Sequence, residues 1–500
     1  MKNYRLDPAR LKKIRTVDPR LVSYNIEMTE ITGGTFWKAY TSEQIEGTEP
    51  FPEISGLTGD FTALAGLMQY YPPINLYDQK LKAYAKALGS AWIRVSGSWA
   101  TKTYYDFENQ TGGKPPKGYN AVLTQKQWIG VLDFVKAVNG KLLISVSNCE
   151  GDHPDGGALD LTQTKKIFDF SHNYGVDIDA AEFMNEPNML TLSGAPKGYT
   201  AADYARDQDI FNAWVKEHYP NCLLAGPCTT GDPSLFEEGD KNMGAGIGSM
   251  VPVATTDELM NGCKIPLDVF SYHYYNGISE RLEAMMPEGH WQADEAHTDR
   301  YLDVAVSCAK KHLPLRDKYV RGGQMWVTES GDAGGGGDTW ASTYLDVLRT
   351  LNELGSFAAV TDGVIFHNTL ASSDYGFLQH GTFEPRPNYY AVLLWNALMG
   401  STVYECDTDK RIYCHSRKDG KDGYAYLMIN NSLTDAMTVT LPADAETYTL
   451  SGGGDIRSRT MFLNGEPLAD ETGTLTTING CKRKAGNFNI QPGDCAFVVI

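Results

Sequence analysis

Short apolar runs alternate with amphipathic helical patterns along residues 21–400. The apolar runs are rich in Val, Ile, Leu and aromatic residues. We interpret them as buried parallel strands, because strands that are covered on both faces carry apolar residues in succession. Eight such runs are present, at residues 21–27, 92–97, 141–147, 180–186, 223–228, 268–275, 324–330 and 362–370.

Helical patterns separate these runs. The clearest follows Thr124, whose side chain suits an N-cap, and it places these apolar residues at helical spacing: Trp128, Val131, Leu132, Val135 and Val138. Other helices are expected at residues 77–88, 162–174, 201–218, 298–312, 339–354 and 388–399. Strands alternating with helices in this way predict an α/β fold, a (β/α)8 TIM barrel over residues 21–400 with long loop insertions. An open doubly wound sheet is the alternative, but the glycine-rich phosphate loop typical of its first strand is missing.

The helical period disappears after Gly400. Short β-type runs then alternate with turn residues such as Asp-Gly and Gly-Gly-Gly, up to a last run at residues 496–500. This pattern predicts a second, smaller all-β domain over residues 401–500, a sandwich. Residues 1–20 precede the first barrel strand, and a further hypothesis is that this segment packs on the sandwich.

The fourth and the seventh predicted barrel strands each have a glutamate at their C-terminal end. Glu186 ends the fourth strand, between Asn185 and Pro187. Glu329 ends the seventh, shortly before four consecutive glycines at residues 334–337. A barrel places the C-terminal ends of its strands on one rim, where active sites lie. Two carboxylates on that rim meet the requirement of glycosidic cleavage, whereas the structural alternative is that each forms a strand-end salt bridge because a desolvated, unpaired carboxylate is costly.

Composition narrows the possible partners. With 44 basic and 62 acidic residues the formal net charge is −18, which repels polyanions at long range and argues against nucleic acid as a partner. The ten histidines are dispersed, without the paired spacing of zinc sites, and no nucleophile elbow is present. We therefore predict neither a metal nor a cofactor. Most of the nine cysteines are expected to be buried free thiols, although Cys481 and Cys495 are a possible disulfide pair in an oxidising compartment.

The first residues show no targeting signal. Their basic side chains have no apolar run behind them, and no transmembrane stretch appears elsewhere in the sequence. We therefore expect no membrane partner and a cytoplasmic location for the sequence as it stands, or a secreted or periplasmic one if a leader has been removed. The sequence leaves the oligomeric state open.

Four motifs, in this order along the chain, resemble the heparanase family of β-glucuronidases. They are MNEPN around Glu186, SYHYYNG at residues 271–277, TESGDAGGGG from Thr328 and SDYGFL around Tyr375. Asn-Glu-Pro alone recurs among many barrel glycosidases, whereas the four motifs together are specific. Members of that family are retaining glycosidases built as a (β/α)8 barrel with a β-sandwich. The resemblance implies the same fold and the cleavage of β-linked glucuronic acid.

The resemblance also implies roles for individual residues. It places the acid/base at Glu186 and the nucleophile at Glu329. Recognition of the uronic acid carboxylate falls on the backbone amides of Gly335 and Gly336 and on the hydroxyl of Tyr375. Amides and a phenol suit an anion and add no bulk. The alternative for these three residues is a mobile glycine loop with a surface tyrosine.

Further residues near the strand ends complete the predicted sugar pocket. Asn185 is expected to bind the sugar 2-hydroxyl, and Tyr274 to donate to Glu329 and keep it ionised. His273 is more readily explained as a core histidine. The remaining candidates, which lie near other strand ends, are Glu27, Asn148, Ser98 and Arg94.

The predicted function is therefore a retaining glycoside hydrolase with a carbohydrate substrate that carries a uronic acid. We expect exo action, releasing glucuronic acid or its 4-O-methyl derivative from glycosides or oligosaccharides. An endo-β-glucuronidase of the heparanase type, acting on glycosaminoglycan chains, is the first alternative, and the acidic balance disfavours it. The second is a catalytically silent carbohydrate-binding barrel, which the intact carboxylate pair disfavours.

Overall fold

The computed structural model describes residues 2–51, 61–237, 239–242, 244, 253–406, 409–468 and 477–500. Within these residues, eight parallel strands close into a barrel in the order β10-β11-β12-β13-β14-β3-β6-β9. Their bounds are β3 (Val22–Glu27), β6 (Trp92–Ser96), β9 (Lys141–Ser145), β10 (Ala180–Glu182), β11 (Leu223–Thr230), β12 (Val269–Ile278), β13 (Gln324–Gly334) and β14 (Ile365–His367). The eight predicted runs are therefore the barrel strands, and consecutive strands are neighbours around the ring.

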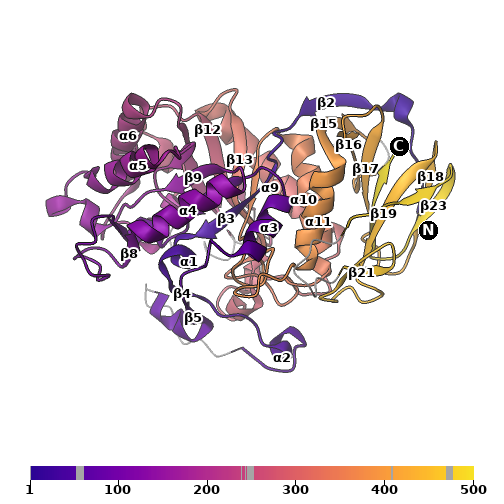
Figure 1. The fold of residues 1–500 in the computed structure, drawn as a ribbon, viewed down its shortest axis with the longest axis horizontal. Coiled ribbons are helices and arrows are strands. Elements are labelled where there is room, and N and C mark those ends of the chain that lie inside the picture. The colour runs from indigo at the N-terminus through magenta and orange to yellow at the C-terminus, as the bar shows by residue number, and fades with distance from the viewer. Residues whose placement is uncertain are drawn as a thin grey trace.

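Helices lie between successive strands on the outside of the barrel (Figure 1). They are α3 (Gln79–Ala87), α4 (Gln125–Ala137), α5 (Thr162–Tyr174), α6 (Ala201–His218), α8 (Thr256–Met260), α9 (Asp299–Tyr319), α10 (Leu345–Val360) and α11 (Pro387–Leu398). Thr124 caps α4 as predicted, accepting a hydrogen bond from the amide of Gln127. α10 begins later than the predicted residue 339, because the amide of Tyr344 donates to the carbonyl of Ser458 in the C-terminal region instead of entering a helix. None of the described helices is both long and apolar enough to span a membrane.

Shorter elements occupy the connections. α1 (Met28–Thr32) follows β3, and β4 (Gly34–Trp37) pairs with β5 (Met68–Tyr71) across a segment that contains α2 (Ser42–Ile45) and η2 (Phe61–Leu67). β7 (Thr103–Asp106) and β8 (Ala121–Thr124) form a parallel pair. The remaining 3-10 helices are η1 (Pro8–Arg10), η3 (Ala100–Lys102), η4 (Glu150–Asp152), η5 (Pro154–Gly156), η6 (Pro187–Ser193), η7 (Pro233–Leu235), η8 (Glu280–Leu282) and η9 (Pro287–Gly289).

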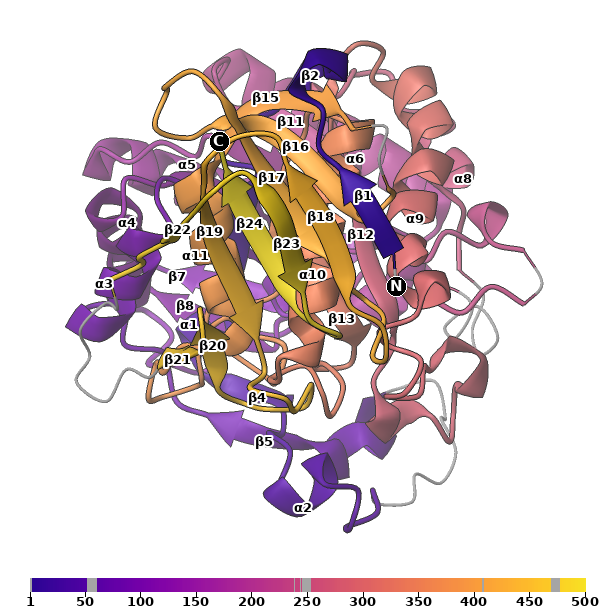
Figure 2. The same cartoon turned by 90° about the vertical axis from the view of Figure 1, so that its right-hand side faces the viewer.

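The C-terminal residues form two further sheets (Figure 2). In the described part of the chain, one sheet has nine strands: β2 (Lys12–Thr16), β15 (Met399–Glu405), β16 (Ile412–Arg417), β17 (Tyr424–Ile429), β24 (Cys495–Val499), β19 (Ala445–Ser451), β20 (Met461–Leu463), β21 (Glu466–Leu468) and β22 (Cys481–Arg483). The other contains β1 (Lys2–Arg5), β18 (Met437–Leu441) and β23 (Gly486–Ile490). Tyr426 and Val498 from the first sheet and Val439 and Phe488 from the second belong to one buried apolar cluster, so the two sheets share a core.

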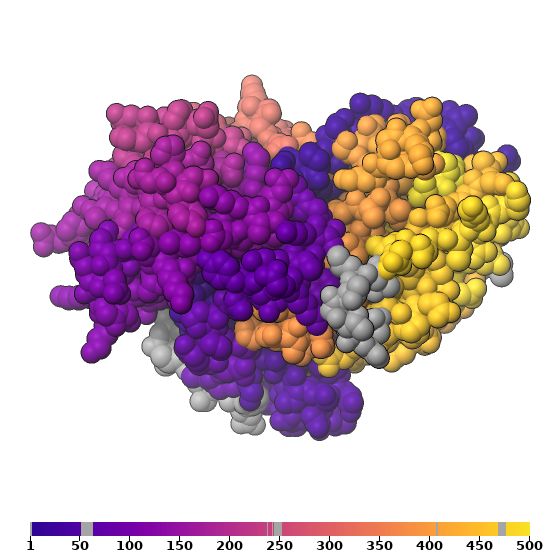
Figure 3. Space-filling model, viewed as in Figure 1, coloured from indigo at the N-terminus to yellow at the C-terminus, as the bar shows by residue number. Residues whose placement is uncertain are grey.

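The first two strands of the chain belong to this β region. β1 pairs in parallel with β18, and β2 pairs antiparallel with β15. In Figure 3 the indigo N-terminal segment lies along the orange and yellow surface of the β region. The polypeptide therefore starts in the β region, passes through the whole barrel and returns.

Buried polar contacts fix the β region against α9 and α10. The hydroxyl of Tyr344 donates to the carbonyl of Leu450 at 2.7 Å and accepts from the amide of Cys495 at 3.1 Å. Arg411, only 2% exposed, donates to Asn352 Oδ1 at 2.9 Å and to Asp303 Oδ1 at 2.7 Å. These contacts cross the boundary between the barrel and the β region, so separating the two parts would break them.

Six of the nine cysteines are buried, as predicted, and the described part of the chain contains no disulfide. The possible pair, Cys481 and Cys495, does not form a disulfide. Cys481 lies on β22 opposite Thr447, and Cys495 lies on β24 opposite Leu450, so β19 separates the two cysteines. A disulfide needs Cα atoms closer than about 7 Å, whereas two strands across a sheet are separated by about 9 to 10 Å.

Candidate active site

The structure brings the two predicted carboxylates together at the C-terminal rim of the barrel. Glu186 follows β10 directly before η6, and Glu329 lies within β13. They are largely buried, with 9% and 5% of each residue exposed. One carboxylate oxygen of Glu186 lies within 4.8 Å of one of Glu329. Glu186 has a φ of 44°, a conformation that is uncommon outside glycine and recurs at functional sites.

His273 on β12 lies between the two carboxylates. Its Nδ1 is 3.0 Å from Oε1 of Glu186 and 3.6 Å from Oε2 of Glu329. Its Nε2 is 3.2 Å from Nη2 of Arg94. A guanidinium only donates, so Nε2 accepts and Nδ1 carries the hydrogen that is donated to Glu186. His273 is therefore part of the site, and the interpretation of it as a core histidine is wrong.

The neighbours of Glu329 favour the ionised form of its carboxyl group. Nη1 of Arg94 donates to Oε1 of Glu329 at 3.0 Å, and the hydroxyl of Tyr275 donates to Oε2 at 2.8 Å. Burial by itself raises the pKa of the Glu329 carboxyl, but attraction to the Nδ1–H of His273 and to the Arg94 cation, together with these hydrogen bonds, outweighs burial and leaves that pKa below its usual value. Burial and the neighbouring Glu329 raise the pKa of Tyr275 well above its usual value, so the phenol remains a donor.

Arg94 on β6 connects the strands that carry the site. Its guanidinium is fully buried, and Nε donates to Oε2 of Glu182 at 2.8 Å. Nη2 donates to Oδ1 of Asn185 at 2.8 Å, and the hydroxyl of Ser96 donates to the same oxygen at 3.2 Å. Because these donors occupy the amide oxygen of Asn185, its Nδ2 group is the end available to a ligand.

Tyr275, and not Tyr274, supplies the hydroxyl at Glu329. Side chains alternate along a strand, so His273 and Tyr275 share the inner face of β12 whereas Tyr274 points the other way. The hydroxyl of Tyr274 donates to Oδ1 of Asn276 instead. The predicted contact of Tyr274 is therefore wrong by one residue, because a run of aromatic residues does not reveal which of its members face the barrel interior.

The glycine run leaves β13 at the same rim. Gly335, Gly336 and Gly337 have φ values of 94°, 98° and 88°, in the region that favours glycine. A Cβ at Gly336 would lie 2.7 Å from Cβ of Trp37, and one at Gly337 would lie 2.8 Å from the amide nitrogen of Tyr375. The run is thus closely packed, which contradicts the alternative of a loose glycine loop.

Tyr375 lies beside the glycine run and close to Tyr275. Asn368 donates from Nδ2 to the hydroxyl of Tyr275 at 2.9 Å and to that of Tyr375 at 3.1 Å. Each hydroxyl accepts from Asn368, which leaves its own hydrogen to donate elsewhere. Tyr375 is 2% exposed, so it is not a surface tyrosine.

The remaining predicted residues differ in their surroundings. Glu27 ends β3 and is buried, and burial together with the neighbouring Glu329 raises the pKa of its carboxyl well above its usual value. Asn148 is fully enclosed, with Oδ1 2.7 Å from Nε2 of His153, so its amide oxygen is committed to a contact within the protein. Ser98 is half-buried in the turn that follows β6.

Glu186, His273 and Glu329 also have the geometry of a possible metal site. Among the residues described, one ligand atom from each lies within 4.8 Å of the others. A cation there would compete with Arg94 for Glu329 and with Glu186 for the Nδ1 of His273. We therefore interpret the group as a carboxylate pair organised by hydrogen bonds.

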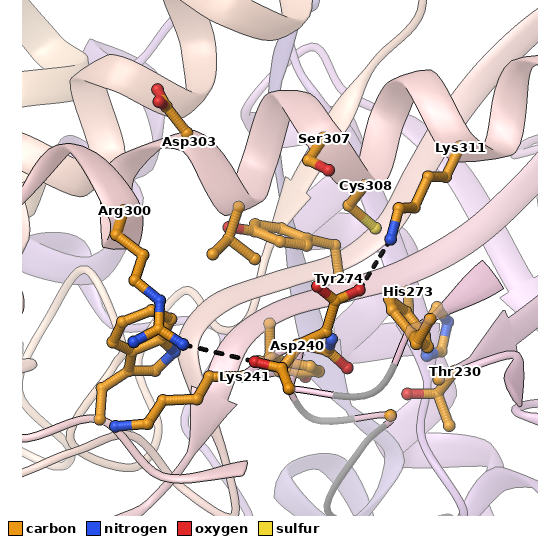
Figure 4. A pocket seen from close by; sticks show the side chains of 18 residues that line it. Thr230, Asp240, Lys241, His273, Tyr274, Arg300, Asp303, Ser307, Cys308 and Lys311 are labelled. Atoms are coloured by element: carbon orange, nitrogen blue, oxygen red, sulfur yellow. Dashed lines mark hydrogen bonds and ion pairs between the residues drawn. The ribbon is translucent and has the colours of Figure 1, made fainter. Parts of the chain in front are cut away.

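A pocket of about 270 Å³ lies beside this site, between β12, α9 and the segment after β11 (Figure 4). His273 and Tyr275 contribute to its wall, but neither carboxylate does. Lys311, which points into it, is paired with Asp240 at 2.7 Å. We place the chemistry at the carboxylates and not in this pocket.

Comparison with known proteins finds relatives but no matching family model. The chain is 26% identical over 476 residues to Heparanase-like protein 1 of Arabidopsis thaliana, covering 83% of this chain and 82% of that protein. It is 32% identical over 364 residues to baicalin-β-D-glucuronidase of Scutellaria baicalensis, covering 68% and 62%. A solved structure of a 4-O-α-L-rhamnosyl-β-D-glucuronidase from Fusarium oxysporum superposes over 100% of both chains with a TM-score of 0.63 at 12% identity, a likeness of fold.

Proposed function

The chain belongs to the heparanase-like family of glucuronidases, and from this premise we propose that it is a retaining glycoside hydrolase that releases terminal β-linked glucuronic acid, or its 4-O-methyl derivative, from glycosides or oligosaccharides. The carboxylate separation supports this proposal most directly, since oxygens of Glu186 and Glu329 lie within 4.8 Å. Retaining glycosidases place their carboxyl groups about 5 to 5.5 Å apart, whereas inverting ones need roughly 6.5 to 9.5 Å to admit a water molecule.

The proposed reaction has two steps. In the first, an oxygen of Glu329 attacks the anomeric carbon while Glu186 gives its proton to the departing oxygen, and a glycosyl-enzyme ester forms. In the second, Glu186 takes a proton from water, whose oxygen bonds to the anomeric carbon and releases Glu329. Arg94 and Tyr275 keep the nucleophile charged, and His273 orients Glu186.

Recognition of the uronic acid is assigned to Gly335, Gly336 and Tyr375. The positive φ values of the two glycines and the close packing of the run support a preformed set of backbone amides beside the catalytic pair. The hydrogen of the Tyr375 hydroxyl is available because its oxygen accepts from Asn368. Asn185, whose Nδ2 is the free end, is assigned to the sugar 2-hydroxyl.

A comparison of two chromogenic substrates tests this function. We expect the wild-type protein to hydrolyse 4-nitrophenyl β-D-glucuronide much faster than the matching β-D-glucoside. Hydrolysis of the glucoside alone would remove the uronic acid from the proposal but keep the glycosidase. Binding of a glucuronide with no turnover of either compound would instead support a silent carbohydrate-binding barrel.

Tyr375→Phe tests the carboxylate-binding role. We expect it to lower kcat/KM for the glucuronide by about 10- to 100-fold, because a hydrogen bond to a charged group is worth about 1.5 to 3 kcal/mol. Activity on the glucoside should change much less, since that substrate has no carboxylate. Equal losses on both substrates would show that the hydroxyl acts only through Asn368.

Tyr275→Phe tests the control of the nucleophile. Glu329 must be ionised to attack, so activity is lost as pH falls through its pKa, and removing a donor that lowers this pKa moves the acidic limb of the kcat/KM profile to higher pH. We expect that shift together with a loss of kcat of about 10-fold or more. Tyr274→Phe is the matched control, and its acidic limb should coincide with that of the wild type. An unmoved limb in Tyr275→Phe would contradict the assigned role.

Product size separates exo from endo action. The net charge of −18 disfavours long polyanionic chains, and this supports release of a single terminal sugar. Digestion of a glucuronic acid-containing oligosaccharide should therefore yield the monosaccharide and a chain shortened by one residue. Internal fragments without monosaccharide would favour the endo-β-glucuronidase alternative.

The organisation of the chain is also part of the proposal. We assign residues 21–400 to the catalytic barrel and residues 401–500 to a β-sandwich domain, to which the first 20 residues contribute through β1 and β2. The shared apolar cluster of the two sheets supports the sandwich, and the pairings of β1 with β18 and of β2 with β15 support the place of the N-terminal segment.

A further inference from the structure

Arg281 is a buried cation beside the site that the proposed reaction does not use. It lies in η8, immediately after β12, and is 4% exposed. A buried guanidinium is costly unless its donors are satisfied, so the partners it has matter for stability and for geometry.

Three residues from two segments provide the partners of Arg281. Nε donates to the hydroxyl of Tyr40 at 3.0 Å, and Nη1 donates to the carbonyl of Lys38 at 2.8 Å. Nη2 lies 3.5 Å from Oδ2 of Asp374. The guanidinium carbon is also 3.9 Å from the centre of the Tyr40 ring and 5.8 Å from that of Trp37. Arg281 therefore fastens the segment after β4 to the loop that carries Tyr375.

The same partners hold the glycine run. The hydroxyl of Tyr40 donates to the carbonyl of Gly337 at 2.7 Å. The amide of Asp374 donates to the carbonyl of Gly336 at 3.0 Å. A closed circuit thus runs from Arg281 through Tyr40 to the glycine run, and back through Asp374.

This circuit fixes both sides of the assigned carboxylate site. Its contacts use the carbonyl oxygens of Gly336 and Gly337, which belong to the peptide planes directly after the Gly336 amide, so they anchor the chain at Gly336 without occupying that amide. Asp374 directly precedes Tyr375, so its position sets that of the tyrosine. The backbone at Gly336 has little room to move, because a Cβ there would already lie 2.7 Å from the Cβ of Trp37.

We propose that Arg281 is a positioning residue for substrate selectivity: by joining Tyr40 to Asp374, it holds the Gly335–Gly336 amides and the Tyr375 hydroxyl in the geometry that binds a sugar carboxylate. The inference rests on the proposed function, since it concerns the recognition of that carboxylate. In this role Arg281 affects substrate selectivity without contacting the substrate.

Selectivity measured with two activated substrates tests the inference. With 2,4-dinitrophenyl β-D-glucuronide and the matching β-D-glucoside, the good leaving group makes the neutral substrate measurable too. We expect Arg281→Gln to lower the ratio of the two kcat/KM values by about 10- to 100-fold, mainly through KM for the glucuronide, because charge-assisted contacts are lost. Tyr40→Phe keeps the ring, loses one oxygen, and should lower the ratio by about 3- to 10-fold.

Arg411→Gln is the matched control, because Arg411 is a similarly buried arginine of the β region, and its carboxylate partner Asp303 lies on α9, in a contact that the assigned substrate site does not use. It should lower the melting temperature and leave the ratio unchanged. If the wild type prefers the glucuronide and both Arg281→Gln and Tyr40→Phe keep the wild-type ratio of kcat/KM values, the positioning role is overturned while the proposed function stands. If Arg281→Gln does not fold, the ratio in Tyr40→Phe decides. Absence of a glucuronide preference in the wild type overturns the proposed function, and the inference with it.

Discussion

Glu329→Gln is expected to lower kcat on an aryl β-D-glucuronide by about 10⁴-fold or more, because the amide cannot form the glycosyl-enzyme ester. The substitution keeps the shape of the side chain and one oxygen, which can still accept a hydrogen bond from one of the two donors, Arg94 or Tyr275. Binding of the substrate should therefore persist, so KM or an inhibitor dissociation constant should change far less than kcat. Initial rates at saturating substrate measure the effect, and circular dichroism with a melting curve checks that the variant is folded.

Chemical rescue separates the nucleophile from other essential groups. In Glu329→Ala, azide has room to enter on the side that the carboxylate vacates, and attack from that side gives α-glucuronosyl azide. The anomeric carbon then gains the nitrogen nucleophile and loses the aryl oxygen in one displacement. A Glu329→Gln variant with full activity, or azide rescue that yields the β-azide, would contradict the assignment.

Glu186→Gln should show a loss that depends on the leaving group. For a poor leaving group such as a simple alkyl or sugar glucuronide, the missing proton donor should cost about 10²- to 10⁴-fold in kcat/KM. For 2,4-dinitrophenyl β-D-glucuronide, which needs no protonation, kcat/KM should remain close to that of the wild type. Rates on a series of aryl glucuronides of graded acidity measure this dependence.

The second step provides an independent check on Glu186. Without its base, the glycosyl-enzyme ester should accumulate on activated substrates, visible as a burst of dinitrophenol followed by slow turnover. In Glu186→Ala, azide should speed that turnover and give β-glucuronosyl azide, opposite to the product of Glu329→Ala. Equal losses across all leaving groups would indicate that Glu186 is structural.

Much of the fold follows from local sequence, and the exceptions have a common cause. The barrel strands were predictable because they are covered on both faces and therefore consist of continuous apolar runs. β2 was not, since Lys12–Thr16 is largely exposed and carries no apolar alternation. β5, Met68–Tyr71, is also incompletely buried. Both depend on a pairing partner distant in the sequence, which periodicity does not reveal.

The site was predictable in its position but not in its internal contacts. Glu186 and Glu329 stood out because they stand at the ends of predicted buried runs, although in the structure Glu186 follows β10 and Glu329 lies within β13. The roles of Arg94, His273 and Tyr275 depend on which side chains of three strands point inwards, and the pairing of β12 with β13 shifts in register at His273. The choice between the adjacent tyrosines failed because both belong to one aromatic run, in which the sequence does not mark the inward-facing members.

Asn368 carried no signal in the sequence. It follows β14 and contacts both Tyr275 and Tyr375, and only the folded rim brings these hydroxyls to one amide. Arg281 is similar, because its partners come from segments more than two hundred and forty positions before it and more than ninety after it. Residues that act through others are recognised only once their partners are placed.

The stereochemistry of the first product tests the central proposal, a retaining glucuronidase with Glu186 and Glu329 as its pair. Proton NMR during hydrolysis of 4-nitrophenyl β-D-glucuronide resolves the two anomers before they interconvert. We expect the β anomer of glucuronic acid to appear first and the α anomer to follow at the rate of mutarotation, as two displacements require. Initial release of the α anomer would contradict the double displacement, and with it the assignment of Glu329 as the nucleophile.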